Sequence, residues 1–152
     1  MKPRAAVILI ENDEIALIDR HRSGKHYLVF PGGKIEAGEI AAYAAQRELM
    51  EELGLEVEID QMVAEVWYEE TPQYYFLGRT IGGRFGLGTG KEMSSLPGSK
   101  KGSHLPVWVP VDDLLFLPVL PKLMAEFVLN SHYSGWPEQP LIVTDQPSDD
   151  PL

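Results

Sequence analysis

The chain has 152 residues, of which 44% are hydrophobic, so the sequence predicts one compact domain with a full-sized core rather than two domains. Its formal net charge of −10 argues against binding to nucleic-acid polymers, because that binding relies on clustered lysine and arginine. The absence of cysteine excludes disulfides and thiolate metal sites, which is typical of a reducing interior, and we expect a cytoplasmic protein.

The N-terminal region predicts β structure, with no signal peptide and no membrane span. Apolar runs at residues 5–10, 15–18 and 27–30 have the length of strands, and the polar residues 11–14 read as a hairpin turn. That turn interrupts the first apolar run, and no run approaches the roughly 18 apolar residues that a membrane span needs.

Residues 40–53 are the clearest predicted helix, because they are rich in Ala, Leu, Met, Gln and Glu and contain no Gly or Pro. Gly54 follows where a C-terminal cap is expected. The segments after it are predicted in this order: strands at residues 55–70 and 73–83 joined near Pro72, a long glycine-rich loop from about 81 to 104, an extended segment at 105–114 and a helix at 121–130.

Three glutamates, Glu48, Glu51 and Glu52, project from one face of the predicted helix. At about 100° per residue they lie inside an arc of roughly 100°. A neighbouring stripe of small and aliphatic residues is available to pack against a sheet: Ala42, Ala45, Leu49 and Leu53. The helix can therefore bury one side and present its acids beside the packing seam.

Two interpretations fit this acidic cluster. It is either a solvated face that favours helix formation or a binding site for a cation. Acids near a helix C-terminus oppose the helix dipole, and Arg47 is the one basic residue close by, which favours the cation. Carboxylate oxygens suit Mg²⁺, which keeps waters, completes its coordination with substrate phosphates and makes a bound water a better nucleophile.

The segment from Gly33 to Leu55 carries a longer pattern. Gly33 is followed after five residues by Glu39 and after seven more by Arg47, and the sequence then reads RELMEELGL. This spacing resembles the complete signature of the Nudix hydrolase family. The approach VFPGGKIEAGE and the later VWVPVDDL with its C-terminal helix are also similar to that family.

The resemblance implies an α+β fold, in which a mixed β-sheet is sandwiched between helices. It covers residues 1–130 as a Nudix hydrolase domain, followed by a C-terminal extension at residues 131–152 that we expect to be ordered only in part.

The resemblance also assigns roles to residues of the signature. It places metal ligands at Glu51 and Glu52, makes Glu48 a third ligand or a catalytic base, and adds the backbone carbonyl of Gly33 as a further ligand. Glu39 and Arg47 occupy positions that brace the loop and helix through a salt bridge, which orients the ligands.

The implied reaction is the hydrolysis of a nucleoside diphosphate linked to another moiety, with Mg²⁺ as the cofactor and Mn²⁺ as a substitute. The general base stays open between Glu48 and an acid outside the signature. Glu92, at the end of the glycine-rich loop, is the second candidate, although it also reads as a solvated loop charge; Glu69 and Glu70 are weaker alternatives.

Substrate contacts are predicted from a small basic and aromatic group before the signature. Arg20 and Arg22 stand out in an acidic chain and are candidate phosphate contacts, although basic residues at a strand end are commonly just solvated. Tyr27 is a candidate for stacking on a base, although most strand aromatics belong to a core. His104 and His132 have no partner at metal-ligand spacing, so no chemistry is assigned to them.

We therefore expect a small-molecule partner, a nucleotide diphosphate derivative, with neither a nucleic-acid polymer nor a membrane as partner. The competing hypothesis is a catalytically silent Nudix-fold nucleotide sensor or binding module. The sequence leaves the substrate and the oligomeric state open, with a homodimer as one option.

Overall fold

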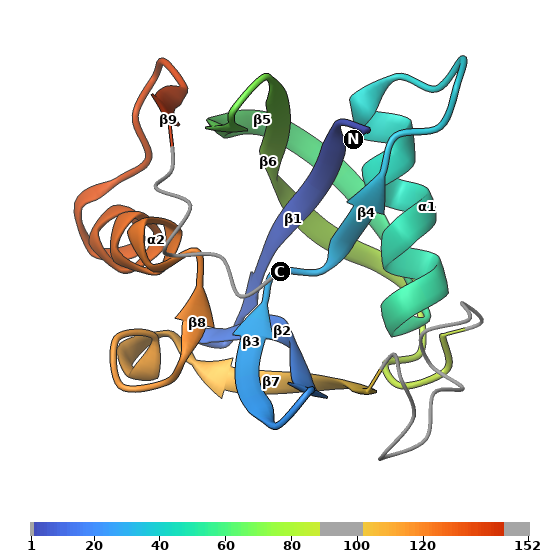
Figure 1. The fold of residues 1–152 in the computed structure, drawn as a ribbon, viewed down its shortest axis with the longest axis vertical. Helices are drawn as coiled ribbons and strands as arrows, with labels where there is room; N and C mark the ends of the chain where they lie inside the picture. The colour runs from blue at the N-terminus through green and yellow to red at the C-terminus, as the bar shows by residue number, and fades with distance from the viewer. Residues whose placement is uncertain (1, 89–101, 145–152) are drawn as a thin grey trace.

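The computed structural model describes residues 2–88 and 102–144, which form one mixed sheet with a helix on each side (Figure 1). The first part of the chain forms β1 (Arg4–Glu11), β2 (Glu14–Arg22), β3 (Lys25–Val29), β4 (Gly32–Lys34), α1 (Ala41–Leu53), β5 (Leu55–Tyr68) and β6 (Thr71–Gly83). The second part forms β7 (Ser103–Pro110), the 3₁₀ turn η2 (Val111–Asp113), β8 (Val119–Leu120), α2 (Lys122–Ser134) and β9 (Leu141–Thr144).

The sheet has the strand order β8-β3-β2-β1-β6-β5-β9, with β4 paired to β1 and β7 paired to β2. The pairs β1–β6, β3–β8 and β5–β9 are parallel and the others antiparallel, so the sheet is mixed. With α1 and α2 on its opposite sides, this arrangement confirms the predicted α+β fold class (Figure 1).

β1 runs through the middle of the molecule and is buried on both faces. Ala5, Val7 and Leu9 belong to the core cluster that includes α1, whereas Ala6 and Ile8 belong to the cluster that includes α2. A strand covered on both faces needs apolar residues at every position rather than at alternate ones, which explains the unbroken apolar run.

The turn predicted at residues 11–14 is confirmed. Asn12 and Asp13 both have positive φ, at 53° and 60°, which is the backbone that a tight two-residue hairpin requires. The predicted turn near Pro72 is displaced, because Glu69 and Glu70 form it and Pro72 lies inside β6 opposite Trp67.

The long glycine-rich loop is shorter than predicted at both ends. β6 continues to Gly83 and β7 already begins at Ser103, because β6 pairs with β5 and β7 with β2 along these residues. Residues 89–101, including Glu92, lie outside the described part of the chain.

The C-terminal helix is longer than predicted, since α2 continues past Asn130 to Ser134. β9 then adds a strand to the sheet, with Leu141 opposite Ala64 of β5. Residues 131–144 thus contribute to the helix and the sheet, and the division of the chain at residue 130 stays a prediction. Among the described residues, none of the helices combines the length and the apolar character needed to cross a bilayer.

Candidate active site

α1 carries the three glutamates on the side that meets the sheet. Ala45, Leu49 and Leu53 are fully buried as predicted, and Ala44 joins them, while Ala42 is only half-buried. The predicted cap is also present, because Gly54 ends the helix with φ 75° and its N–H donates to the Met50 carbonyl. This packing fixes the rotation of α1 about its axis.

With that rotation, two of the three carboxylates sink into the protein surface. Glu48 and Glu52 are only 9% and 7% exposed, whereas the side chain of Glu51 is 37% exposed. Carboxylates are rarely buried to this degree unless charged or polar groups compensate them. The surroundings of α1 supply part of that compensation.

The short strand β4 lies directly against these acids. The Gly32 N–H donates to Oε1 of Glu52 at 2.7 Å. A Cβ atom on Gly33 would lie 2.3 Å from Cδ of Glu48, and one on Gly32 would lie 2.2 Å from the Ala5 carbonyl oxygen. A side chain at Gly32 would push β4 away from β1, and a side chain at Gly33 would displace the carboxylate of Glu48, so the two glycines permit the close approach of β4 to β1 and α1.

Arg47 holds the loop before the helix to the acidic face. Its Nε and Nη2 donate to the two oxygens of Glu39 at 2.7 and 3.0 Å, and Nη2 also donates to the Lys34 carbonyl at 3.0 Å. Its Nη1 lies 3.0 Å from Glu48 and 3.3 Å from Glu51. This guanidinium therefore orients two of the three glutamates while it fixes the loop, as predicted for a bracing residue.

The charges of this bridge shift each other's protonation. The hydrogen bonds from Arg47, followed by the backbone N–H of Glu36, hold the pKa of Glu39 below its usual value. The hydrogen bonds to Glu39 and Glu48 in turn raise the pKa of Arg47 above its ordinary value. The brace is thus an ion pair at neutral pH.

A cavity of about 540 Å³ opens over the acidic face. Its lining comes from the first two strands, the loop around β4, α1 and β7: Arg4, Ile18, Arg20, Val29, Phe30, Gly32, Gly33, Lys34, Glu36, Arg47, Glu48, Glu51, Glu52 and His104. The size is in the range of small-molecule sites, so the acids face a space that can hold a ligand.

The cavity combines charges of both signs. Glu48, Glu51 and Glu52 line it from α1, whereas Arg4, Arg20 and Lys34 line it from the strands. This arrangement suits a ligand that is itself anionic and is bridged to the glutamates by cations.

The predicted substrate contacts fall in different places. Arg20 lines the cavity, whereas Arg22 is exposed and is not part of the lining. Tyr27 is buried, with the Arg20 guanidinium 5.8 Å from the centre of its ring, and so cannot stack on a base in this conformation. Glu69 and Glu70 lie in the β5–β6 turn, outside the lining.

Sequence reasoning missed four polar residues of the lining, Arg4, Lys34, Glu36 and His104. Arg4 lies opposite Lys34 in the β1–β4 pair, and His104 lies opposite Arg20 in the β2–β7 pair. Each pair meets across strands that are distant in sequence, so only the register brings it to the cavity.

The donor set fits a hard divalent cation. Three carboxylates on successive turns of one rigid helix provide oxygen ligands, and Arg47 contacts two of them, Glu48 and Glu51, directly. The backbone of Gly33 lies directly against the Glu48 carboxylate, since a Cβ there would be 2.3 Å from Cδ of Glu48, and the predicted ligand role of its carbonyl stays a prediction. Glu48, Glu51, Glu52 and Gly33 are thus the residues available to hold Mg²⁺ or Mn²⁺.

A mixed sheet between two helices, with a glycine strand against a helix that carries buried glutamates, defines an α+β protein with a cavity whose glutamates suit a divalent cation. The family model described as NUDIX domain matches residues 1–130 of this chain. The chain belongs to the NUDIX domain family, which confirms the resemblance seen in the sequence.

Individual relatives share parts of this chain. The human 8-oxo-dGDP phosphatase NUDT18 is 39% identical over 82 residues, which are 51% of this chain and 25% of that protein. The 8-oxo-dGTP diphosphatase of Escherichia coli (strain K12) is 40% identical over 67 residues, which are 41% of this chain and 50% of that protein. The chain therefore matches half or less of the length of these curated relatives.

Solved structures share the fold along nearly the whole chain. An ADP-ribose pyrophosphatase from Streptococcus suis has a TM-score of 0.62 at 21% identity, over 95% of this chain and 98% of its own. At this level of identity, the similarity extends to the fold.

Proposed function

We propose that this protein is a Mg²⁺-dependent pyrophosphohydrolase that cleaves a nucleoside diphosphate linked to another moiety. The observation that carries the proposal is that Glu48, Glu51 and Glu52 line the same cavity as Arg4, Arg20 and Lys34. An acidic protein has little general affinity for phosphates. A cavity that combines three glutamates able to hold cations (the acidic wall) with Arg4, Arg20 and Lys34 (the basic wall) is therefore specifically suited to bind them.

Each group has a distinct role in this scheme. Glu51 and Glu52 would hold the ions, with the Gly33 carbonyl as a further ligand and Glu48 as either a third ligand or the general base. A Mg²⁺ ion held by these residues would supply Lewis-acid chemistry, namely compensation of the charge on the phosphates and a more acidic bound water. Arg47 and Glu39 keep the glutamates in place.

The basic wall positions the substrate. Arg20 and Arg4 carry guanidinium groups that suit paired phosphate oxygens. Lys34, the last residue of β4, supplies a single positive charge. Together they align the diphosphate with the acidic wall, so that water can attack one phosphorus while the bridging oxygen departs with the other phosphoryl group.

Glu48 is the general base that the described residues support, because it is buried in the cavity beside the ions' ligands. Glu92 stays the alternative base, and it lies outside the described residues. A Glu48→Gln variant separates the two, since loss of the base lowers turnover and removes the rise of the rate with pH on the acidic side of the profile.

The substrate itself is a small nucleotide derivative. The names of the relatives point to 8-oxo-dGDP, 8-oxo-dGTP and ADP-ribose as the first compounds to try, and all three contain the diphosphate that the cavity's charges suit. The part attached to the diphosphate would select among them.

A substrate panel tests this function. The wild-type protein is incubated with nucleoside triphosphates, oxidised nucleotides, ADP-ribose, nucleotide sugars and dinucleoside polyphosphates, in Mg²⁺ and in excess chelator. We expect Mg²⁺-dependent release of a nucleoside monophosphate, phosphate or pyrophosphate from at least one class. Tight binding without turnover of any compound would favour the sensor hypothesis and reject the enzyme.

A further inference from the structure

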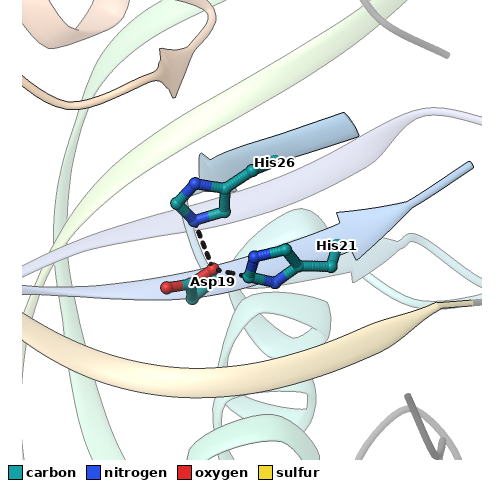
Figure 2. A group of neighbouring side chains, drawn as sticks. All are labelled: Asp19, His21 and His26. Carbon is teal, nitrogen blue, oxygen red and sulfur yellow. Dashed lines mark hydrogen bonds and ion pairs between the residues drawn. The ribbon is translucent and has the colours of Figure 1, made fainter. Parts of the chain in front are cut away.

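A second cluster of metal-ligating side chains lies away from the acidic cavity. Asp19 and His21 belong to β2, and His26 belongs to β3, directly opposite His21 in the register of the two strands. Each of the three offers one ligand atom, and these atoms all lie within 4.8 Å of one another. Figure 2 shows both imidazoles directed at the carboxylate of Asp19.

This cluster is on the other face of β2 from the cavity. Successive side chains of a strand point to opposite faces, and Ile18 and Arg20 line the cavity. Asp19 and His21 therefore point the other way, along the face on which Leu17 belongs to the α2-side core. The two groups share a strand and no ligand.

The distances in the cluster are close to those of a metal site. Nε2 of His26 and Nδ1 of His21 lie 2.8 and 3.7 Å from the same oxygen of Asp19. Ligands held at about 2.0–2.1 Å in a tetrahedron are about 3.3 Å from one another. If the His26–Asp19 distance lengthened and the His21–Asp19 distance shortened by about half an ångström each, one ion could replace the proton of the His26–Asp19 hydrogen bond.

The imidazoles are also arranged in advance. Their rings are stacked with centroids 4.3 Å apart and an interplanar angle of 9°, so the two side chains lie on the same face of the hairpin. The Asp19 side chain is the least exposed of the three at 25%, while His21 and His26 are 64% and 44% exposed. An ion can enter from solvent and keep one coordination position for water.

We propose that Asp19, His21 and His26 form a second metal site, which takes a transition-metal ion of the zinc type and ties β2 to β3. Two imidazoles and one carboxylate select zinc and its neighbours, whereas an all-oxygen set selects Mg²⁺. The site is independent of the proposed hydrolase activity and would exist in a protein that only binds nucleotides.

Zinc binding is tested in a variant in which two glutamates of α1 are replaced, so that α1 cannot compete with the second site for zinc. The background is the metal-stripped Glu51→Gln/Glu52→Gln variant, titrated with Zn²⁺ by calorimetry. We expect one ion per chain and a loss of at least ten-fold in affinity when either His21→Ala or His26→Ala is added. With Co²⁺ in place of Zn²⁺, the background protein should show the intense visible band of four-coordinate nitrogen and oxygen ligation. The proteins that also carry His21→Ala or His26→Ala should lack this band.

His132→Ala is the matched control, because His132 also lies against one aspartate, with its Nε2 3.0 Å from Asp13, and has no second imidazole within reach among the described residues. It should leave zinc affinity unchanged. Equal affinity in the His21→Ala and background proteins, or an equal loss in His132→Ala, would overturn the site.

The two metal sites are distinguished by a second measurement. His21→Ala in the otherwise wild-type chain should retain Mg²⁺-dependent turnover, and its circular dichroism should match that of the wild type. If the substrate panel fails and zinc still binds, the proposed function falls and this site stands; the reverse result rejects the site alone.

Discussion

Single atoms decide whether the acidic face can exist. Gly33 has no Cβ, and the carboxylate of Glu48 lies where a Cβ would be, while the N–H of Gly32 is bonded to Glu52. Gly33 thus leaves space for the carboxylate of Glu48, whereas Gly32 donates a hydrogen bond to Glu52. The sequence pattern shows that glycine stands there, and the structure gives the steric reason.

Gly33→Ala is expected to displace Glu48 from the cavity. The added methyl group would lie 2.3 Å from Cδ of Glu48, so strand or side chain must move, at a cost of about 1–3 kcal/mol in the free energy of unfolding. Urea denaturation measures that cost, and Mg²⁺-dependent turnover should fall at least ten-fold.

Gly82→Ala is the control for this change, because its Cβ would meet only the flexible side chain of Glu56, at 3.0 Å. Both activity and stability should stay close to those of the wild type. If Gly33→Ala behaved like Gly82→Ala, the close packing of β4 on Glu48 would not matter for the site.

The ion pair of Glu39 and Arg47 predicts a pH dependence at the same scale. Arg47 lowers the folded-state pKa of Glu39, so the pair's contribution to stability is fully present above the ordinary carboxyl value of 4.5. It is lost as pH falls through the lowered pKa. In urea denaturation between pH 7 and pH 3, Glu39→Gln should therefore differ most from wild type at neutral pH, and the two should converge in acid. A constant difference across this range would show that Glu39 contributes through packing and not through its charge.

Among the elements, α1 is the most predictable and the strands around it are less so. The spacing of apolar residues in α1, its cap at Gly54 and the position of its glutamates follow from local sequence. The displaced turn at Glu69 and the added strand β9 do not, because both depend on pairing between distant segments. Arg4 and Lys34 of the cavity lining were not predicted for the same reason, since these two residues meet only through the β1–β4 register.

Arg47→Lys is expected to loosen α1 from the loop that precedes it. A lysine keeps the charge but cannot contact Glu39 with two donors and also reach Glu48 and the Lys34 carbonyl. Turnover should fall about 10–100-fold, the range for groups that orient metal ligands, with kcat affected more than KM.

Arg79→Lys provides the comparison, because Arg79 forms a 2.7 Å salt bridge with Glu58 that is exposed on both sides. Exposed pairs contribute little, so this variant should keep its turnover and stability. An equal loss of turnover in both variants would mean that the chain responds to arginine replacement in general.

For the molecule as a whole, we expect the like charges of the cavity glutamates to destabilise the folded state until cations bind. Glu51→Gln/Glu52→Gln should unfold at the same or a higher temperature than the wild type in chelator, because two like charges have gone. Mg²⁺ at about 100 times its dissociation constant should add about 2.7 kcal/mol to the stability of the wild type and nothing comparable to the variant. Thermal unfolding with and without Mg²⁺ measures both. A Mg²⁺ shift that survives in the variant would place the cation elsewhere.

The most direct test of the cation-dependent hydrolysis is the rate of Mg²⁺-dependent product release by Glu52→Gln, on whichever compound the wild type turns over. Glutamine can still accept the N–H of Gly32, so the fold is kept and one negative charge is lost. Glu126→Gln, an exposed glutamate on α2, is the control. The account predicts that turnover is abolished in Glu52→Gln and unchanged in Glu126→Gln; full turnover in a folded Glu52→Gln protein would contradict it.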